Sequence, residues 1–250
     1  MSTIRANIYS NSLSRQVNIT VVLPIENEMP ADGYKTLYLL NGFMGDDLDW
    51  LQDTRVKRWA LENNLAVVMP AGENGFYVND ERGRRNYSQY IGEELVAITR
   101  KMFPLSTKRE HTFIAGLSMG GYGAITNGLK YSDVFGKIGA FSLALVNELT
   151  IVEDSISKPK FINQIFGQDV TSIRNSDQDP RYLIENFKGS WPQIYLACGY
   201  DDFVFHCSEL VHAHLEEYKV NHTYVKTEGG HEWDFWDAQI YQFIKWLNVK

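Results

Sequence analysis

Short apolar segments alternate with segments of helical periodicity along most of this chain of 250 residues. Residues 36–40 and 65–69 are nearly continuous in apolar side chains, which is typical of strands buried on both faces of a sheet. Between them, Asp53 or Thr54 can cap a helix that continues to about residue 63. This alternation predicts an α/β protein with a mostly parallel central sheet and helices on both faces.

The other expected elements continue the same order to the end of the chain. Strands are expected at residues 17–23, 112–115, 138–143, 193–198 and 222–227. Helices are expected at residues 91–102, 119–131, 206–218 and 233–247. No repeat or Pro/Gly/Ser-rich linker divides the sequence, so residues 1–250 are expected to form a single domain.

Residues 144–190 interrupt this order. The segment is polar and rich in Asp, Asn and Ser, with one clear helix start where Asp179 precedes Pro180. Because it is long for a connection, we interpret it as a small cap or lid-like insertion over one end of the sheet. A surface excursion without function would explain the same composition.

Charge and composition limit the partners of the chain. The formal net charge of −7 argues against nucleic acid, because phosphate binding needs a basic face. The N-terminal residues lack the apolar stretch of about 7–15 residues that a secretory signal needs, and no run approaches the roughly 20 apolar residues that span a bilayer. A cytoplasmic protein without a membrane partner is therefore expected. Cys198 and Cys207 are too few for a disulfide framework or a four-thiolate zinc site, so free thiols are expected.

A G-x-S-x-G motif stands at residues 116–120, between an expected strand and an expected helix. Glycines beside the serine permit a sharp turn in which a Cβ atom would clash. Such a turn raises the Ser118 hydroxyl above the carboxyl ends of the strands, where open α/β sheets bind ligands. Ser118 is therefore predicted to be a nucleophile. The backbone N–H of Met119, at the start of the helix, is predicted to stabilise an oxyanion.

A serine nucleophile needs a base, and His231 is the only one of six histidines in a loop after the last expected strand. The acid that orients this base should follow the penultimate strand, where Asp201 and Asp202 both qualify. Spacing alone does not choose between these two carboxylates. A zinc motif H-E-x-x-H would need histidine where Phe235 stands, and no metal site is predicted.

The loop after residues 36–40 is expected to supply the second oxyanion donor. The backbone N–H of Phe43 is the predicted donor, and Gly42 permits the close approach of the substrate. Several aromatic residues lie in or beside the loops expected to converge on the site, and we interpret them as walls of a substrate pocket, with core packing as the alternative. They are Trp50, Tyr77, Tyr122, Trp233 and Trp236.

Arg82, Arg84 and Arg85 form the basic cluster of this acidic chain. They could attract an anionic substrate, but pairing with Asp80 and Glu81 at the surface is the simpler explanation.

With these residues in place, the chain resembles the esterase D family of α/β-hydrolases, which includes S-formylglutathione hydrolases, and is most similar to bacterial tributyrin esterases. The resemblance covers most of the chain and rests on the blocks LYLLNGFMGDDLDW, FYVNDERGRRNYSQYIGEEL, AGLSMGGYGA, LACGYDDFVF and GGHEWDFW. It implies an α/β-hydrolase fold, Asp202 as the acid, His231 as the base and no cofactor. Relatives commonly carry His-Gly where this chain has Asn41-Gly42, so hydrogen bonding near the pocket should differ.

The resemblance also implies a substrate class. Its members act on short-acyl or formyl esters and thioesters, and some cleave hydroxycinnamoyl esters. We therefore expect a serine carboxylesterase that hydrolyses small short-chain acyl esters through an acyl-enzyme. Alternatives are an S-formylglutathione hydrolase or other thioesterase, a feruloyl-type esterase, an acyltransferase and a non-catalytic binding module. A homo-oligomer is suggested by the resemblance alone.

Overall fold

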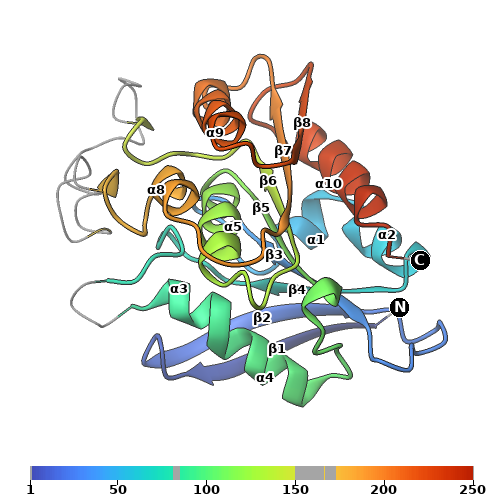
Figure 1. Ribbon diagram of the computed structural model, residues 1–250. Coiled ribbons are helices and arrows are strands. Elements are labelled where there is room, and N and C mark those ends of the chain that lie inside the picture. Colours follow the sequence, from blue (N-terminus) through green and yellow to red (C-terminus); the bar gives the residue numbers. More distant parts are fainter. Residues whose placement is uncertain (1, 81–84, 150–165, 167–172, 250) are drawn as a thin grey trace.

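The computed structural model describes residues 2–80, 85–149, 166 and 173–249. Within these residues, eight strands form one sheet in the order β1-β2-β4-β3-β5-β6-β7-β8 (Figure 1). The strands are β1 Ser2–Ser10, β2 Arg15–Leu23, β3 Lys35–Leu40, β4 Leu65–Pro70, β5 Thr112–Leu117, β6 Lys137–Phe141, β7 Gln193–Gly199 and β8 His222–Thr227. β1 and β2 pair antiparallel, as do β2 and β4, and every other neighbouring pair is parallel. The predicted α/β fold with a mostly parallel sheet is confirmed.

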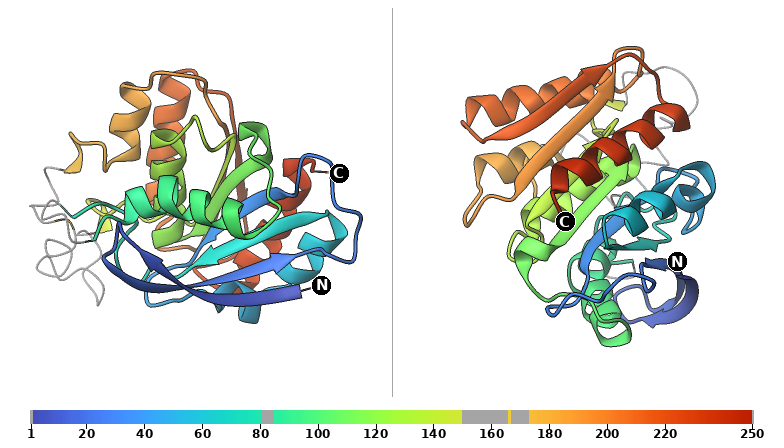
Figure 2. Two further views of the ribbon diagram at one scale, coloured as in Figure 1. Left: turned by 90° about the horizontal axis from the view of Figure 1, so that it is seen from below. Right: turned by 90° about the vertical axis from the view of Figure 1, so that its right-hand side faces the viewer.

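Helices cover both faces of the sheet, as Figure 2 shows. One face carries α5 Met119–Lys130, α8 Pro180–Glu185, α9 Phe205–Glu217 and a continuous helical stretch of α3 Tyr87–Gln89, the π-helical η1 Tyr90–Glu94 and α4 Leu95–Met102. The other face carries α1 Asp49–Asp53, α2 Val56–Glu62 and α10 Trp233–Leu247. A short 3₁₀ turn, η2 Arg109–His111, leads into β5.

The alternation of side chains along β3 explains why the described residues form two hydrophobic cores, one on each face of the sheet. Tyr38 and Leu40 pack into the core under α5 and α9, whereas Leu37 and Leu39 pack into the core under α2 and α10. Successive side chains of a strand point to opposite faces, so a continuous apolar strand can serve both cores.

The register of the parallel strands brings their carboxyl ends to one edge of the sheet. Leu40 pairs with Gly116, Leu117 with Phe141, and Gly199 with Thr227. The loops that follow β3, β5, β6, β7 and β8 therefore begin at nearly the same level, which is where open α/β sheets place ligands.

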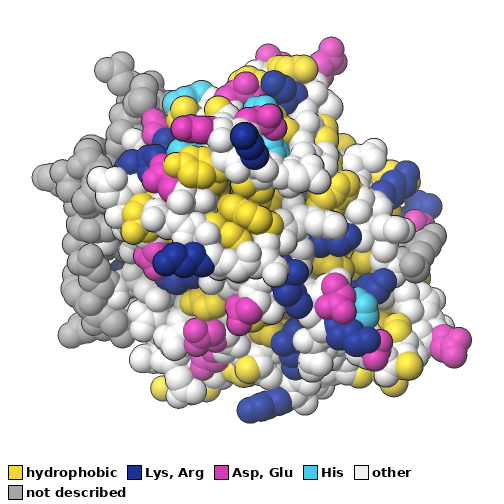
Figure 3. All heavy atoms as spheres, viewed as in Figure 1, with side chains coloured by type: hydrophobic (Ala, Val, Ile, Leu, Met, Phe, Trp, Pro, Cys, Tyr) yellow, Lys and Arg dark blue, Asp and Glu magenta, His cyan; other side chains and the backbone are white. Residues whose placement is uncertain are grey.

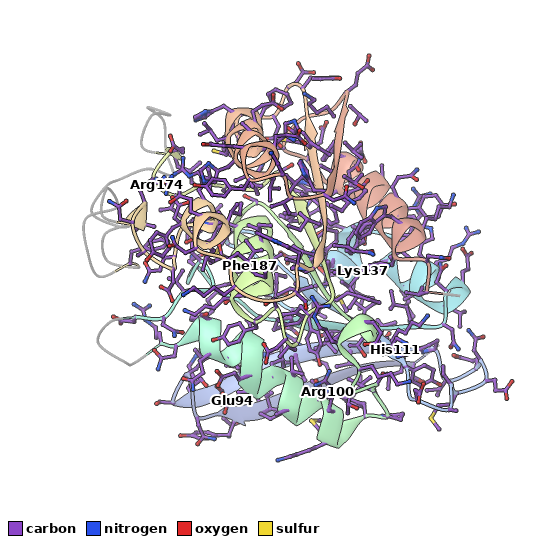
Figure 4. The ribbon with its side chains drawn as sticks, in the orientation of Figure 1. Glu94, Arg100, His111, Lys137, Arg174 and Phe187 are labelled. Carbon is purple, nitrogen blue, oxygen red and sulfur yellow. The ribbon has the colours of Figure 1, made fainter. Side chains whose placement is uncertain are left out.

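The strand β1 was not expected from the sequence. It pairs with β2 alone and exposes many of its side chains, so it lacks the apolar run of a central strand. Glu94 connects the hairpin of β1 and β2 to the helical stretch beside it (Figure 4). Its carboxylate accepts hydrogen bonds from the Ser10 hydroxyl at 2.6 Å and from the Asn11 N–H at 2.7 Å. An edge hairpin held by polar contacts leaves little hydrophobic periodicity in the sequence.

Part of the proposed cap at residues 144–190, namely residues 150–165 and 167–172, lies outside the described residues. The described part begins α8 where the sequence indicated it, and the Asp179 carboxylate caps this helix by accepting the Arg181 N–H at 2.8 Å. Phe166 is buried against the rings of Phe76 and Tyr122. Among the described helices, none combines the length and the apolar character needed to cross a membrane.

Candidate active site

The turn between β5 and α5 holds Ser118 in a strained conformation. Ser118 has φ of 54° and ψ of −116°, outside the favoured regions for a residue with a side chain. A Cβ atom on Gly116 would lie 2.5 Å from the carbonyl carbon of Gly120, and one on Gly120 would lie 2.5 Å from the Leu40 oxygen. The two glycines of G-x-S-x-G thus let the start of α5 approach β5 and β3 closely enough to form the sharp turn.

Three side chains from three different loops form a continuous series of hydrogen bonds. The Ser118 hydroxyl lies 3.0 Å from His231 Nε2, and His231 Nδ1 lies 2.9 Å from Oδ1 and 3.1 Å from Oδ2 of Asp202. Asp202 is buried, whereas the neighbouring Asp201 is exposed. The geometry therefore places Asp202, rather than Asp201, against the imidazole.

Several donors keep Asp202 ionised. Burial by itself would raise the pKa of this carboxyl, but hydrogen bonds and charge from His231, a hydrogen bond from the Ser142 hydroxyl and one from the Val204 N–H hold the pKa below its ordinary value. The Val204 N–H lies 2.9 Å from Oδ1. An ionised Asp202 can accept the Nδ1–H of His231, which leaves Nε2 as the nitrogen that faces the Ser118 hydroxyl.

Ser142 is a site residue that the sequence did not reveal. It follows β6, is fully buried and accepts a hydrogen bond from the indole N–H of Trp236 at 3.0 Å. Its hydroxyl in turn reaches Asp202, so it links α10 to the acid. No local motif marks this serine, because its importance comes from a contact between elements that lie far apart in the chain.

The loop after β3 is held by a buried network around Asn41. The Asn41 amide donates to the Gly42 carbonyl at 2.8 Å, and its Oδ1 accepts the Gly72 N–H at 2.9 Å. The Tyr77 hydroxyl lies 2.9 Å from Asn41 Oδ1 and 3.0 Å from the Asn41 carbonyl oxygen. Asn41 therefore anchors the segment that carries Gly42 and Phe43.

A cavity of about 530 Å³ opens beside Ser118 and His231. Its lining consists of Gly42, Phe43, Met44, Gly45, Asp49, Leu117, Ser118, Phe203, His231, Glu232, Trp233 and Trp236. Met119, predicted to donate from its backbone, is buried at the start of α5 directly after Ser118. The cavity is thus bounded by apolar and aromatic groups on several sides, the usual character of a small-molecule pocket.

The predicted pocket aromatics divide into two groups. Trp233 and Trp236 line the cavity. Trp50 is buried behind Trp233, with ring centroids 5.6 Å apart, and donates its indole N–H to the Leu40 oxygen at 2.9 Å. Tyr77 and Tyr122 are buried away from this cavity, the first against Asn41 and the second with its hydroxyl donating to the Gln178 carbonyl. Trp50, Tyr77 and Tyr122 therefore support the walls from behind rather than facing the cavity.

The cavity has an acidic side. Burial raises the pKa of the Asp49 carboxyl, and the nearby carboxylates of Asp46, Asp53 and Asp47 add to the rise, against a backbone hydrogen bond from Asp46. Glu232 also belongs to the lining and accepts the Gly230 N–H at 3.1 Å. No Lys or Arg belongs to the described lining.

The arginine cluster lies partly outside the described residues, because Arg82 and Arg84 are not described. Arg85 is exposed, and its carbonyl oxygen accepts the Asp80 N–H at 3.1 Å. The two cysteines are buried free thiols. Burial raises the pKa of Cys198 to about 12 and that of Cys207 to about 11, so neither is suited to act as a thiolate at neutral pH.

Comparison with known proteins places the chain among esterases. The family model described as "Putative esterase" matches residues 10–247. An acetyl esterase of Caldicellulosiruptor saccharolyticus is 36% identical over an alignment of 263 residues. The alignment covers 99% of this chain and 98% of that protein. The crystal structure of an S-formylglutathione hydrolase from Staphylococcus aureus has a TM-score of 0.86 at 29% identity and covers 100% of this chain and 99% of its own. The fluorophosphonate-binding serine hydrolase F of the same organism has a TM-score of 0.87 at 29% identity, covering 100% and 98%.

These findings define a carboxylic ester hydrolase with an α/β-hydrolase fold. Within that class, the chain belongs to the "Putative esterase" family, whose model spans nearly its whole length. The resemblance to S-formylglutathione hydrolase-like enzymes inferred from sequence blocks is confirmed.

Proposed function

We propose that the protein is a serine carboxylesterase that hydrolyses short-chain acyl esters through an acyl-enzyme intermediate. The observation that carries this proposal is the series of hydrogen bonds from Ser118 through His231 to Asp202, with separations of 3.0 Å and 2.9 Å. A hydroxyl, an imidazole and a buried carboxylate in this order form the arrangement that activates a serine nucleophile.

In the proposed reaction, Ser118 Oγ attacks the ester carbonyl while His231 Nε2 accepts the hydroxyl proton. Asp202 stabilises the imidazolium that forms. His231 then gives the proton to the departing alcohol, and the acyl group remains on Ser118. Water then attacks the carbonyl of the acyl-enzyme while His231 Nε2 accepts a proton from the water. His231 gives this proton to Ser118 Oγ, and the carboxylic acid is released.

The backbone N–H groups of Phe43 and Met119 are proposed to bind the oxyanion. Met119 begins α5, where the helix dipole and unpaired N–H groups favour negative charge. Phe43 follows Gly42, where a Cβ atom would lie 2.5 Å from Leu117 Cδ1, so the glycine allows this loop to approach β5. Donors held by the protein before the reaction stabilise the tetrahedral intermediate without reorganisation.

We expect Ser118→Ala to lower kcat for p-nitrophenyl acetate by at least about 10⁴-fold, because it removes the nucleophile. Ser190→Ala is the matched control, since Ser190 is exposed and its described hydrogen bond uses the backbone carbonyl. A serine-directed fluorophosphonate should label the wild-type protein and Ser190→Ala but not Ser118→Ala. Unchanged turnover in Ser118→Ala would refute the nucleophile assignment and would leave a non-catalytic or differently catalysed site.

The acidic side of the cavity supports neutral esters as substrates over S-formylglutathione. A glutathione leaving group carries two carboxylates, and Asp49 and Glu232 would repel them in a cavity of about 530 Å³. The acetyl esterase relative favours a short acyl group. The likeness to an S-formylglutathione hydrolase keeps the thioester as the second candidate.

A substrate panel separates these candidates. We expect kcat/KM to be highest for acetyl and butyryl esters, tributyrin included, and at least about 10-fold lower for S-formylglutathione and methyl ferulate. The double variant Asp49→Asn/Glu232→Gln should reduce the ratio of kcat/KM for the acetyl ester to kcat/KM for S-formylglutathione several-fold, because it removes two negative charges from the cavity. A higher kcat/KM for S-formylglutathione in the wild-type protein would assign the thioesterase activity instead, and a product formed with added alcohol would reveal acyl transfer.

Two wider proposals come from the sequence: a homo-oligomer in the cytoplasm, whose oligomeric state the family resemblance suggests, and a cap formed by residues 144–190, which rests on the length and polar composition of that segment. Size-exclusion chromatography with light scattering tests the first by giving the mass in solution. Deleting residues 150–165 tests the second, since loss of a cap should alter KM for longer acyl chains more than for acetate.

A further inference from the structure

A group of three metal-ligating side chains lies where α9 meets β8, and sequence motifs did not reveal it. His212 and Glu216 are four residues apart on α9, and His222 is the first residue of β8. One ligand atom from each of the three lies within 4.8 Å of the others. Figure 3 shows histidine and acidic side chains gathered over this part of the molecule. The spacing H-x₃-E-x₅-H in the sequence is the signal that could have indicated the group.

The two imidazole rings already face each other through the atoms that would bind an ion. His212 Nδ1 lies 2.8 Å from His222 Nε2, and Glu216 Oε1 lies 3.8 Å from the same His222 nitrogen. In a tetrahedral site with bonds of about 2.0–2.1 Å, two nitrogen ligands lie about 3.3 Å apart. The rings therefore need to separate by only a fraction of an ångström to admit a cation.

The surroundings of His222 fix which of its nitrogens can bind a metal. His222 Nδ1 lies 2.8 Å from the Val220 carbonyl oxygen, which can only accept a hydrogen bond. Nδ1 therefore carries the proton, and Nε2 presents its lone pair to His212. A carbonyl acceptor behind a ligating imidazole is the usual way in which proteins fix the tautomer and the ring orientation of a metal ligand.

The three residues differ in exposure in a way that suits a surface-accessible ion. The His222 side chain is 2% exposed and Glu216 is 67% exposed. The His212 ring packs on the Tyr224 ring, with centroids 4.7 Å apart. Two packed imidazoles and one exposed carboxylate supply three ligands, which leaves a fourth tetrahedral position open to water.

We propose that His212 Nδ1, His222 Nε2 and Glu216 bind a divalent transition metal ion of the Zn²⁺ type. Two imidazoles and one carboxylate favour Zn²⁺, Ni²⁺ or Cu²⁺ over Mg²⁺ and Ca²⁺, which prefer oxygen ligands throughout. On binding, the proton that lies between the two rings moves to Nε2 of His212, so both ligand atoms offer lone pairs.

The place of the site in the fold indicates what the ion would do. α9 begins shortly after the Asp202 loop, and β8 ends shortly before the His231 loop. His222 lies at the amino end of β8, whereas His231 follows its carboxyl end. The ion would therefore link α9 to β8, the helix and strand next to the loops of Asp202 and His231. It would stabilise the folded protein without contacting the substrate.

The test measures Zn²⁺ binding directly. Wild-type protein freed of metal with a chelator and titrated with Zn²⁺ by calorimetry should bind one ion per chain, with a rise in Tm. His212→Gln and His222→Gln should each weaken binding at least about 10-fold and abolish the Tm shift at the Zn²⁺ concentration that saturates the wild type. The matched control is His206→Gln on the same helix, whose exposed side chain lies outside the group. It should bind Zn²⁺ as the wild type does.

Two further measurements keep the outcome decisive. Glu216→Gln changes an exposed side chain and leaves the core intact, so it should fold normally and weaken Zn²⁺ binding even if a histidine variant does not fold. Ser118→Ala should bind Zn²⁺ like the wild type, which separates this site from the esterase proposal. Unchanged binding in the His212, His222 and Glu216 variants, or no saturable binding to the wild type, would show that the two rings share only a hydrogen bond.

Discussion

At the scale of single residues, Asp202 and Asp201 show how environment divides two adjacent carboxylates. Asp202 is buried and accepts hydrogen bonds from His231 and the Val204 N–H, whereas Asp201 is exposed. Asp202→Asn should lower kcat by about 10³–10⁴-fold, because an amide favours the wrong imidazole tautomer. Asp201→Asn should change kcat less than about threefold, since exposed substitutions have small effects. Steady-state kinetics with p-nitrophenyl acetate compares the two, and equal losses would contradict the assignment.

The lowered pKa of Asp202 also predicts how stability responds to acid. Because the folded-state pKa lies below the value in the unfolded chain, the unfolded state binds more protons as the pH falls. The contribution of Asp202 is thus fully present above its unfolded pKa of about 3.9, and it is lost as the pH drops through the folded value. Urea unfolding from pH 6 down to pH 3 should show a weaker pH dependence in Asp202→Asn than in Asp201→Asn.

At the scale of elements, the loop after β3 depends on a tyrosine from a distant segment. Tyr77→Phe removes the hydroxyl that bonds both oxygens of Asn41, so the Gly42–Phe43 backbone should lose its fixed position. We expect kcat to fall about 10-fold with little change in KM, together with a loss of about 1 kcal/mol in the free energy of unfolding. Tyr38→Phe is the matched control, because its buried hydroxyl bonds Thr99 within the core. It should lose similar stability and keep its kcat.

The elements with strong local signals could be predicted from the sequence. The expected strand at residues 222–227 and the expected helix at residues 233–247 coincide with β8 and α10. The turn at Ser118 could be predicted because the glycines at 116 and 120 have a direct steric cause: a Cβ atom at either position would clash in the turn between strand and helix. Periodicity and backbone sterics act within a few residues, so a single sequence displays them.

Features that depend on contacts between distant segments could not be predicted in the same way. The sequence suggests pocket walls for Tyr77 and Tyr122, with core packing as the alternative, and in the structure both are buried away from the cavity beside Ser118. Aromatic side chains near a site have the same sequence signature whether they face the ligand or support the wall. Ser142 carried no signal at all, because its link to Trp236 joins α10 to the end of β6.

At the scale of the whole molecule, Phe141 joins the sheet to the helices on one of its faces. Its ring is fully buried and meets those of Trp50, Tyr195 and Phe243 at 6.2, 6.3 and 5.7 Å. Phe141→Ala should lower the free energy of unfolding by about 3–5 kcal/mol, because the cavity it leaves lies between rigid elements. Phe187, labelled in Figure 4, has a half-buried ring that stacks on Trp191. Phe187→Ala should therefore lower the free energy of unfolding clearly less in the same urea titration.

The parallel register that aligns the ends of β5, β7 and β8 has a consequence for how the protein can be studied. Ser118, Asp202 and His231 follow three different strands, β5, β7 and β8, so their side chains meet only when these strands are assembled in the sheet. If these residues act together as proposed, turnover becomes a reporter of folding cooperativity. Activity and circular dichroism should then disappear over the same denaturant range, and an assay of a few minutes would measure the integrity of the entire architecture.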